Sequence, residues 1–304
     1  MKKVVSVSLG SRKGDFRAET VFAGETFEIS RIGTAGDLQE YARLLTELDG
    51  SVDAIGLGGI DLYLVAGGRK YAFRDARKLA SLVKITPVVD GSGLKNTLER
   101  ETLKWCQSEG IIDFKASKTL VVCAVDRFGM AEEVAAMGGP VRYGDLMFNL
   151  GIPVWIKSFS LVKALARVML PVVVQMPFQW LYPTGEKQDQ PTPKFGWAYQ
   201  WADIIAGDRH LIHRYLPQGT GSLQGKAIIT NTTTQASREE LKARGTRLLV
   251  TTTPSFEGRS PGTNVLEGVL VACMAKRPEE LTVSDYNTML QELGWKPEVV
   301  YFKD

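Results

Sequence analysis

Cysteine is scarce in this chain of 304 residues, and its three copies are scattered. Cys106, Cys123 and Cys273 stand in apolar or helical contexts and form no C-x-x-C motif. Closely spaced cysteines are the usual sign of a disulfide framework or a zinc site, so neither organises this fold. We expect reduced, buried thiols in a cytoplasmic protein.

The sequence also lacks a marked charge excess and a long uninterrupted apolar run. Thirty-seven Lys and Arg residues against 34 Asp and Glu residues give a net charge of +3, too small to indicate binding to nucleic acid. The N-terminal MKKVVSVSLG holds too short an apolar stretch for a signal peptide, and we expect a first strand there. With 44% hydrophobic and 23% charged residues, the chain has the composition of a globular protein long enough for two domains.

The stretch from Thr119 to Phe148 has the pattern of a βαβ unit. An apolar, β-branched run over 120–125 predicts a buried parallel strand, with a short helix over 130–137 and a second strand over 141–143. Asp145 follows the second strand about 20 residues beyond the first turn, where a dinucleotide-binding fold places the carboxylate that holds the adenosine ribose.

The turn after the first of these strands has no glycine-rich phosphate loop. A G-x-G-x-x-G loop lets bare backbone approach a pyrophosphate at a helix N-terminus, whereas this turn reads AVDRFG over 124–129. Asp126 would repel a phosphate, Arg127 could compensate by pairing with Asp126, and Gly129 is the one bare position. We expect these three residues to contact NAD or NADP, or else another ligand on a Rossmann-like scaffold.

Residues 1–115 predict a mixed α/β domain. Two alternating segments, 16–22 and 26–32, flank an Ala-Gly turn and predict a hairpin, and the spacing of leucines predicts a helix over Leu38–Leu48. A strand over 85–89 is expected to end at Asp90, just before a helix that begins at Ser92. We assign the remainder, 116–304, to a Rossmann-like parallel-sheet domain, so the expected fold class is α/β.

Three features occur in this order along the chain: a segment with Gly93, Asn96 and Thr97, a K-x-L-V-V strand from Lys118, and an ITNTTT strand end. In these features the chain resembles the shikimate and quinate dehydrogenase family. The strings VDRFGMAEEVA, YGDLMF, WLYPTGEK and GTNVLEG are moreover similar to a group of bacterial proteins labelled quinate 5-dehydrogenase, over nearly the full length.

This resemblance implies an NAD(P)-dependent oxidoreductase acting on a cyclic polyol carboxylate such as quinate or shikimate. The family carries its hydride chemistry on a Lys/Asp pair with the Asp directly after Asn-Thr, where this chain has Leu98. Lys95 is the nearest lysine, so we expect it to act as general base beside Asp61 or Asp90, with Asn96 binding the substrate. The alternative, favoured by the missing glycines, is a non-redox protein that binds a small molecule.

The chain has only two histidines, His210 and His213, directly after a predicted strand that ends near Asp208. Three residues apart on a helix, they lie at the sheet edge where ligands bind in open α/β folds. Asp208 could orient His210 as a general acid/base. Alternatively, His210 caps the strand–helix turn and His213 is a surface residue. Since the spacing supplies only Asp208 as a further ligand, we expect no metal site.

Two later strands are expected to end in hydroxyl-rich segments at one edge of the second sheet. Thr232 and Thr253 follow these strands and would line the nicotinamide side of a dehydrogenase. Arg259 and Asn264 precede an apolar helix, and its N-terminus is a place where a substrate carboxylate could dock.

The segment from Leu161 to Tyr182 is strongly apolar but is interrupted by Lys163, Arg167 and Pro171. A spanning helix needs about 20 apolar residues with few charges, so this is not a clean transmembrane segment. We favour a helix packed on a sheet or in a homodimer interface over an amphipathic surface for a membrane, which would suit an enzyme acting on a lipid-like substrate. The polar run that follows, 183–193, is either a lid or a connector.

Overall fold

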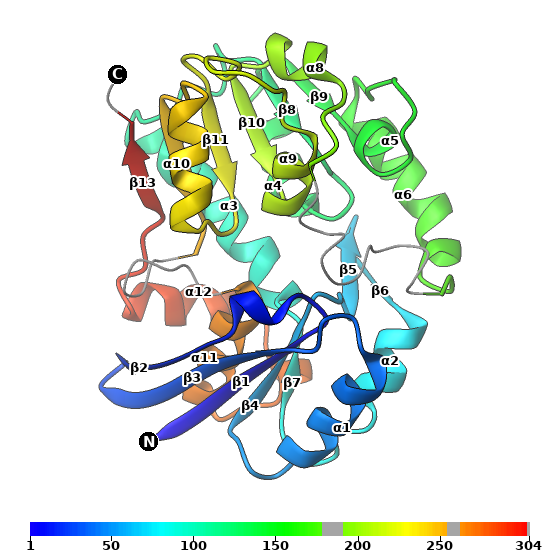
Figure 1. Cartoon of the computed structure of the whole chain (residues 1–304), viewed down its shortest axis with the longest axis vertical. Coiled ribbons are helices and arrows are strands. Elements are labelled where there is room, and N and C mark those ends of the chain that lie inside the picture. The colour runs from blue at the N-terminus through cyan, green and yellow to red at the C-terminus, as the bar shows by residue number, and fades with distance from the viewer. Residues whose placement is uncertain (178–190, 254–261, 303–304) are drawn as a thin grey trace. The chain divides into compact units, whose positions relative to one another are not determined.

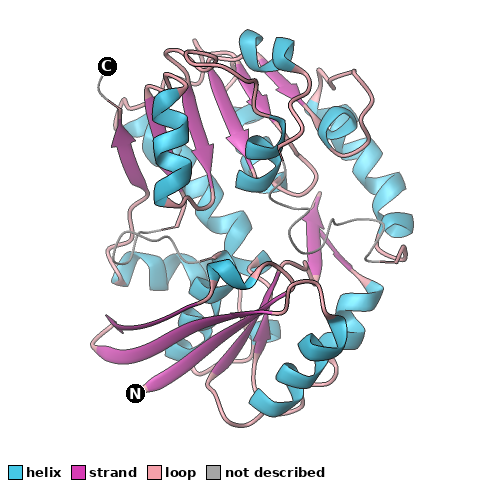
Figure 2. Ribbon diagram, viewed as in Figure 1, coloured by secondary structure: helices cyan, strands magenta, loops and turns pink. Residues whose placement is uncertain are grey.

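The computed structural model describes residues 1–177, 191–253 and 262–302 and divides the chain into two compact units (Figure 1). Of the described residues, the first unit contains 1–97, 169–177 and 262–295. The second contains 98–168, 191–253 and 296–302. Each unit has a largely parallel sheet with helices, which confirms the expected α/β class (Figure 2).

The sheet of the first unit has five strands in the order β2-β3-β1-β4-β7. All neighbours are parallel except β2 and β3, which form the predicted hairpin. The expected strand over 85–89 is shorter than predicted, because only two of its residues pair with β4. The strands are β1 (Lys2–Ser8), β2 (Phe16–Phe22), β3 (Glu25–Gly33), β4 (Ala54–Gly58) and β7 (Val88–Val89), and β5 (Tyr63–Ala66) and β6 (Arg69–Ala72) form a separate hairpin.

Helices from both ends of the chain belong to this first unit. Helix α1 (Leu38–Leu48) has the predicted bounds, since Asp37 caps its N-terminus and Tyr41 and Leu45, four residues apart, are buried. Near the C-terminus, α11 (Thr263–Met274) packs on β1, β4 and β7. The other elements are α2 (Arg74–Ala80), α12 (Val283–Glu292) and the short 3-10 helices at Arg12–Gly14 and Pro278–Glu280.

The expected division into domains 1–115 and 116–304 is therefore wrong for the C-terminal helices. Eight residues of α11, Val265 through Ala272, are buried, and a helix buried this thoroughly needs a sheet to cover it. Gly268 permits the close approach, because a Cβ at this position would lie 2.8 Å from Val4 Cγ1. The first unit is thus completed by residues that follow the second one in sequence.

The sheet of the second unit has six strands in the order β9-β8-β10-β11-β12-β13. The first five are parallel, and β13 pairs with β12 in the antiparallel direction. Because β9 and β10 flank β8 on opposite sides, the chain reverses direction across the sheet between β8 and β10. In open α/β sheets ligands bind at such a switch point. The strands are β8 (Thr119–Val121), β9 (Val141–Tyr143), β10 (Ile204–Gly207), β11 (Ala227–Thr230), β12 (Leu248–Thr251) and β13 (Glu298–Tyr301).

Both faces of this sheet are buried, as expected for parallel strands. Along β8, Leu120 contributes to one apolar cluster and Val121 to another, and Leu249 and Val250 divide in the same way along β12. The helices are α3 (Ser92–Ser108), which begins in the first unit, α4 (Phe128–Ala136), α5 (Asp145–Phe148), α6 (Phe159–Val173), which ends in the first unit, α8 (Gly196–Trp201), α9 (Arg209–Tyr215) and α10 (Gln235–Ala243).

Two strands in this unit differ from the sequence prediction. The strand expected over 120–125 ends at Val121, because the backbone N–H groups of Ala124 and Val125 bond to the side chain of Asp145 and not to a neighbouring strand. The strand that precedes Thr253, β12, is followed by β13, a strand that was not predicted from the sequence. The thiols agree with expectation, since Cys106 and Cys123 are buried and Cys273 is partly so, all three without a disulfide.

Candidate functional site

In the first unit, loops from neighbouring strands meet at the carboxyl edge of the sheet. β4 and β7 are parallel neighbours, so the segments after Gly58 and after Val89 leave the same edge side by side. The first segment carries Asp61, and the second leads directly into α3, whose first turn carries Lys95. The topology alone therefore brings an acid and a base to one place.

Lys95 and Asp61 face each other there. Lys95 Nζ lies 3.5 Å from Asp61 Oδ1, and the two side chains are only 14% and 20% exposed. A partly buried amine beside a carboxylate is an arrangement that can hold a proton and transfer it to a bound hydroxyl or carbonyl group. The structure thus selects Asp61, and not Asp90, as the carboxylate paired with Lys95.

The carboxylate of Asp90 accepts hydrogen bonds from the backbone. Its Oδ2 accepts the backbone N–H of Leu62 at 2.6 Å and of Tyr63 at 2.9 Å, and its Oδ1 accepts that of Ser92 at 3.0 Å. These bonds fix the residues that follow Asp61 against the start of α3. Both oxygens bond to backbone, which gives Asp90 a positioning role, and its expected catalytic role stays a prediction.

A buried carboxylate that the sequence interpretation missed supports the same edge. Glu267 of α11 is 3% exposed; its Oε2 accepts the N–H of Gly91 at 2.6 Å, and its Oε1 accepts the hydroxyl of Tyr286 at 2.7 Å. Burial, reinforced by the charge of Asp90, raises the pKa of Glu267 to about 7. The sequence did contain a sign of this buried carboxylate, since Glu267 is the single charged residue in the otherwise largely apolar segment that forms α11.

The predicted substrate-binding residues are placed as follows. Asn264 lies in the first turn of α11, where its Nδ2 donates to Ser6 Oγ of β1 at 2.7 Å. Asn96 lies beside Lys95 in α3 and is partly exposed. Arg259 falls outside the described residues. Binding of a substrate by these side chains stays a prediction.

In the second unit, the switch point between β8 and β10 is filled by a buried arginine. Arg127, only 4% exposed at its side chain, pairs through Nη1 with Glu99 of α3 and through Nη2 with Asp208 at 2.6 Å. Its Nε also lies 3.2 Å from Asp126 Oδ2. Burial alone would lower the pKa of Arg127, but the three carboxylates hold it well above its ordinary value, so the guanidinium stays charged. The ion pairs join the turn after β8 to the turn after β10.

The carboxylate of Asp145 points back into the same turn. Its two oxygens accept the N–H groups of Ala124 at 3.1 Å and Val125 at 2.9 Å, and the residue is 8% exposed. Burial raises the pKa of Asp145 to about 6, against the lowering effect of these bonds. Asp145 therefore stabilises the β8–α4 turn, and its expected contact with a ribose stays a prediction.

The turn does not fit the pyrophosphate of NAD or NADP in the way a glycine loop would. Arg127 is committed to ion pairs, Gly129 is buried within α4, and the side chains at the turn include Asp126 and Asp208. Such carboxylates repel a phosphate, and no bare backbone replaces the missing glycines. Sequence reasoning anticipated that Arg127 would pair with Asp126 but missed Glu99, which stands 28 residues earlier.

Asp208 also begins the helix that carries the histidines. Its Oδ1 accepts the backbone N–H of His210 at 2.8 Å and of Leu211 at 3.4 Å, so Asp208, and not His210, caps α9. The side chain of His210 is exposed, beside the guanidinium of Arg209. A general acid/base role for His210 therefore stays a prediction, with Asp208 orienting its backbone.

The hydroxyl-rich strand ends do meet at one edge, as expected from the parallel pairing of β11 and β12. Thr253 is fully buried and its hydroxyl donates to the carbonyl of Asn231 at 2.7 Å, so it ties the two strand ends together. Thr232 is partly exposed and can still face a ligand. Among the described residues no group of three or more His, Cys, Asp or Glu side chains could hold a metal ion.

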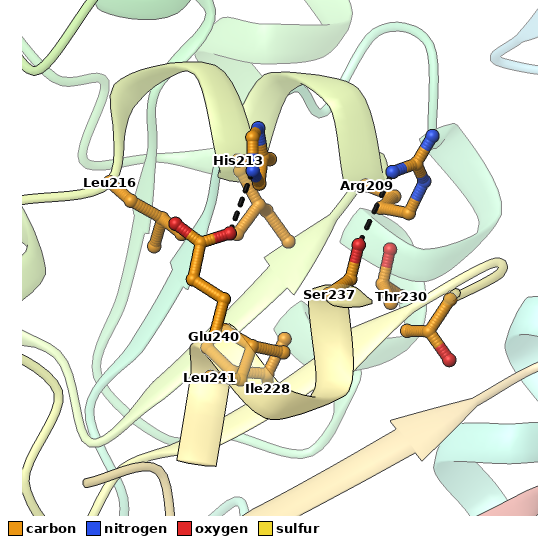
Figure 3. Close-up of a pocket in the computed structure, with 10 residues that line it drawn as sticks. Arg209, His213, Leu216, Ile228, Thr230, Ser237, Glu240 and Leu241 are labelled. Carbon is orange, nitrogen blue, oxygen red and sulfur yellow. Dashed lines mark hydrogen bonds and ion pairs between the residues drawn. The ribbon is translucent and has the colours of Figure 1, made fainter. Parts of the chain in front are cut away.

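A small hollow lies between α9 and α10, over β11 (Figure 3). His213 Nε2 and Glu240 Oε2, 2.7 Å apart, bridge one side, and Arg209 Nη1 and Ser237 Oγ, 3.4 Å apart, bridge the other. Its volume of about 20 Å³ is enough for one water molecule. The Lys95–Asp61 pair at the carboxyl edge of the first sheet is the candidate site.

Two family profiles match the chain. A family described as "Domain of unknown function (DUF8754)" matches residues 93–302, more than half of the chain, and one described as "Domain of unknown function (DUF8753)" matches residues 3–90. Comparison with curated proteins found no significant match. Neither description names an activity, so the resemblance to quinate and shikimate dehydrogenases stays a prediction.

The solved structures that match this chain include both binding proteins and dehydrogenases. A substrate-binding protein of a sugar ABC transport system from Bordetella parapertussis is 11% identical, with a TM-score of 0.39 over 99% of this chain and 89% of that one. Glutamate dehydrogenase from Thermus thermophilus is 12% identical, with a TM-score of 0.45 over 96% of this chain and 74% of that one. A putative malic enzyme is 12% identical, with a TM-score of 0.38 and coverages of 96% and 83%. At these scores the likenesses carry no argument about activity.

Proposed function

The chain belongs to the family described as "Domain of unknown function (DUF8754)", and from its own geometry we propose that it binds a hydroxylated small molecule at the carboxyl edge of the first sheet. In this proposal Lys95 exchanges a proton with a hydroxyl or carbonyl group of the ligand. Asp61 holds the Lys95 ammonium in place, and Asp90 positions the segment that carries Asp61.

The observation that carries the proposal is the 3.5 Å contact between Lys95 Nζ and Asp61 Oδ1 on two largely buried side chains. An ion pair that serves only stability is usually exposed and worth little, whereas this one lies at the strand ends where open α/β sheets bind ligands. An ammonium group at this place can donate a proton to a carbonyl oxygen, and the neutral amine can accept one from a hydroxyl group.

The reaction we propose is oxidation of a cyclic polyol carboxylate such as quinate or shikimate, the reaction class implied by the sequence resemblance. Its support is that a Lys/Asp pair lies in the first unit, although the carboxylate is supplied by Asp61 and not by position 98. NAD or NADP would be the oxidant and would take up the hydride. The nucleotide would have to bind without a glycine loop. In this proposal it contacts Thr232, whose side chain is partly exposed.

A second candidate is a non-redox protein that binds a small molecule. It is favoured by the Arg127 ion pairs with Glu99 and Asp208, which occupy the switch point where a nucleotide would place its phosphates. In this case the Lys95–Asp61 pair would recognise a hydroxyl or carboxylate group of the ligand and transfer no hydride.

Thermal-shift titration separates the two candidates. Purified protein is titrated with NAD, NADH, NADP and NADPH, and separately with quinate and with shikimate. A ligand at 100 times its dissociation constant stabilises the folded state by about 2.7 kcal/mol, which gives a clear shift in Tm. An increase in Tm with a nucleotide supports the oxidoreductase. An increase with quinate or shikimate but with no nucleotide supports the non-redox candidate. An unchanged Tm with all six ligands contradicts both.

Matched variants test the site itself. Lys95→Met should abolish the shift given by a polyol, because it removes the charged group that meets the ligand. Lys78→Met is the control, since Lys78 is 71% exposed on α2 and its ion pair is with Asp75 of the same helix. Equal polyol shifts in both variants would show that the ligand does not bind at Lys95.

A further inference from the structure

Helix α6 carries two apolar faces, and only one of them is packed. Val162, Ala166 and Leu170 recur every four residues and are buried. Leu161, Val168 and Val172 follow the spacing i, i+7, i+11, which gathers them on a different face, and they are 49%, 74% and 66% exposed. The favoured expectation of a packed helix thus holds for one of its two apolar faces.

Exposed apolar side chains are concentrated in this part of the chain. Among the described residues, seven of the fourteen large apolar side chains that are exposed fall between positions 150 and 172. Isolated exposed apolar residues are normal, but a contiguous group of them marks an interaction surface. We call the part of this group that lies on the helix the α6 surface, and it consists of Leu161, Val168, Met169 and Val172.

The charged residues in the segment of the chain that contains the α6 surface are all basic. From Leu146 to Pro177 the sequence contains Lys157, Lys163 and Arg167 and no Asp or Glu. All three basic side chains are exposed, and Lys163 also lies 3.6 Å from Glu132 of the neighbouring α4. An apolar stripe flanked by basic residues is the pattern of a helix that lies in the interface of a membrane with anionic lipids.

We propose that the α6 surface docks onto an anionic lipid bilayer, with the helix lying in the plane of the membrane. With 15 residues, α6 is about 22 Å long and shorter than a spanning helix. Among the described residues, no helix is both long and apolar enough to cross a bilayer. The exposed valines and leucines enter the boundary between headgroups and acyl chains, and the basic residues meet the lipid phosphates.

The same charges disfavour a second copy of the chain as the occupant. In a two-fold dimer the same patch meets itself, so Lys157 and Arg167 of both copies would come together over a surface whose own sequence supplies no acidic residue. Juxtaposed like charges oppose such an interface. An anionic bilayer, by contrast, is complementary in both apolar character and charge.

Co-sedimentation of the full chain with vesicles tests the proposal. One vesicle preparation is phosphatidylcholine alone and the other adds phosphatidylserine. We expect binding to the anionic vesicles to exceed binding to the neutral ones. It should weaken as the salt concentration is raised, because salt screens the attraction between the basic residues and the lipid phosphates. The double variant V168S/V172S should bind the anionic vesicles about tenfold more weakly, since it removes the apolar contribution.

The control variant V21S/V283S removes two valines that are 66% and 53% exposed elsewhere in the chain. It should bind as the wild type does, and circular dichroism with Tm measurement confirms that both double variants are folded. Absence of binding to either vesicle, or equal binding by both double variants, overturns the proposal. A dimer measured by light scattering that dissociates in V168S/V172S also overturns it, because the α6 surface would then be a subunit interface.

Discussion

Arg127 Nη2 and Asp208 Oδ2 lie 2.6 Å apart, and this ion pair connects the ends of β8 and β10 at the point where the sheet of the second unit reverses direction. Folds of this class commonly leave this place open for a ligand. Here it is closed by side chains, with Glu99 on the other side of the guanidinium. The second unit is therefore built around a charged group where a nucleotide-binding protein would have glycines.

The first prediction concerns this buried arginine. Arg127→Met should lower the free energy of unfolding by about 3–5 kcal/mol, because it leaves Glu99 buried without its countercharge. The double variant E99Q/R127M should recover part of the loss. Denaturant titration measures both. The exposed pair formed by Arg43 and Glu47 supplies the control, since Arg43→Met should leave the stability nearly unchanged. A similar effect of both arginine substitutions would contradict the proposed structural role.

The second prediction separates the two carboxylates near Lys95. Asp90→Ala should destabilise the protein by about 1–3 kcal/mol, because three backbone N–H groups lose their acceptor. Asp61→Ala should cost less, since its described contact, the ion pair with Lys95 at 3.5 Å, is longer and weaker than the hydrogen bonds of Asp90 at 2.6–3.0 Å. Thermal unfolding of both variants provides the comparison. If Asp61→Ala proved the more damaging, Asp61 and not Asp90 would be the structural carboxylate.

The third prediction is a dependence of stability on pH. Because the pKa of Glu267 is raised from 4.5 to about 7, the folded state keeps a proton that the unfolded state releases. The stability contributed by this protonated side chain is complete below the unfolded pKa and is lost as pH rises through 7. Glu267→Gln cannot ionise, so between about pH 5 and about pH 8 its free energy of unfolding should fall by about 2 kcal/mol less than that of the wild type.

The control for this pH series is Glu47→Gln, which changes a carboxylate that is 55% exposed. Its pH profile should follow the wild type. Parallel profiles for Glu267→Gln and the wild type would mean that Glu267 is already ionised in the folded state.

The fourth prediction ranks the cysteines by their reactivity. Burial raises the pKa of Cys106 to about 12 and that of Cys123 well above its ordinary value, so neither forms the reactive thiolate readily. Burial also raises the pKa of Cys273, but this residue is only partly buried. With a thiol-specific reagent and mass spectrometry, Cys273 should be modified first and the other two at the rate of unfolding. Rapid modification of Cys123 in the folded protein would be the opposite result.

Local patterns in the sequence were sufficient for some elements and not for others. The helix Leu38–Leu48 and the strand Val141–Tyr143 were predicted with their observed bounds, because leucine spacing and turn residues lie within each segment. Strand β13 was missed since its four residues are partly or fully exposed and become a strand only by pairing with β12. Pairing with a strand that is distant in the sequence produces no periodic pattern of apolar residues from which the strand could be predicted.

The candidate site shows the same division. Lys95 beside Asp61 or Asp90 could be anticipated from the resemblance to the shikimate and quinate dehydrogenases, because Lys95 directly precedes Asn96 and Thr97. The choice of Asp61 over Asp90 could not, since it depends on which carboxylate the backbone N–H groups of Leu62 and Tyr63 occupy. Glu99 gave no signal, because it stands within a helix whose partner, Arg127, is 28 residues away.

The return of α11 to the first sheet sets an order of events during synthesis. When residues 1–97 have left the ribosome, the helix that covers β1, β4 and β7 has not yet been made. At ordinary rates of translation the intervening 164 residues, from 98 to 261, take on the order of ten seconds or more. During that time Val4 and Ala54 are not yet covered by α11, so the nascent first unit exposes apolar strands to which chaperones can bind. The second unit, except for β13, has been synthesised before α11 can complete the first unit.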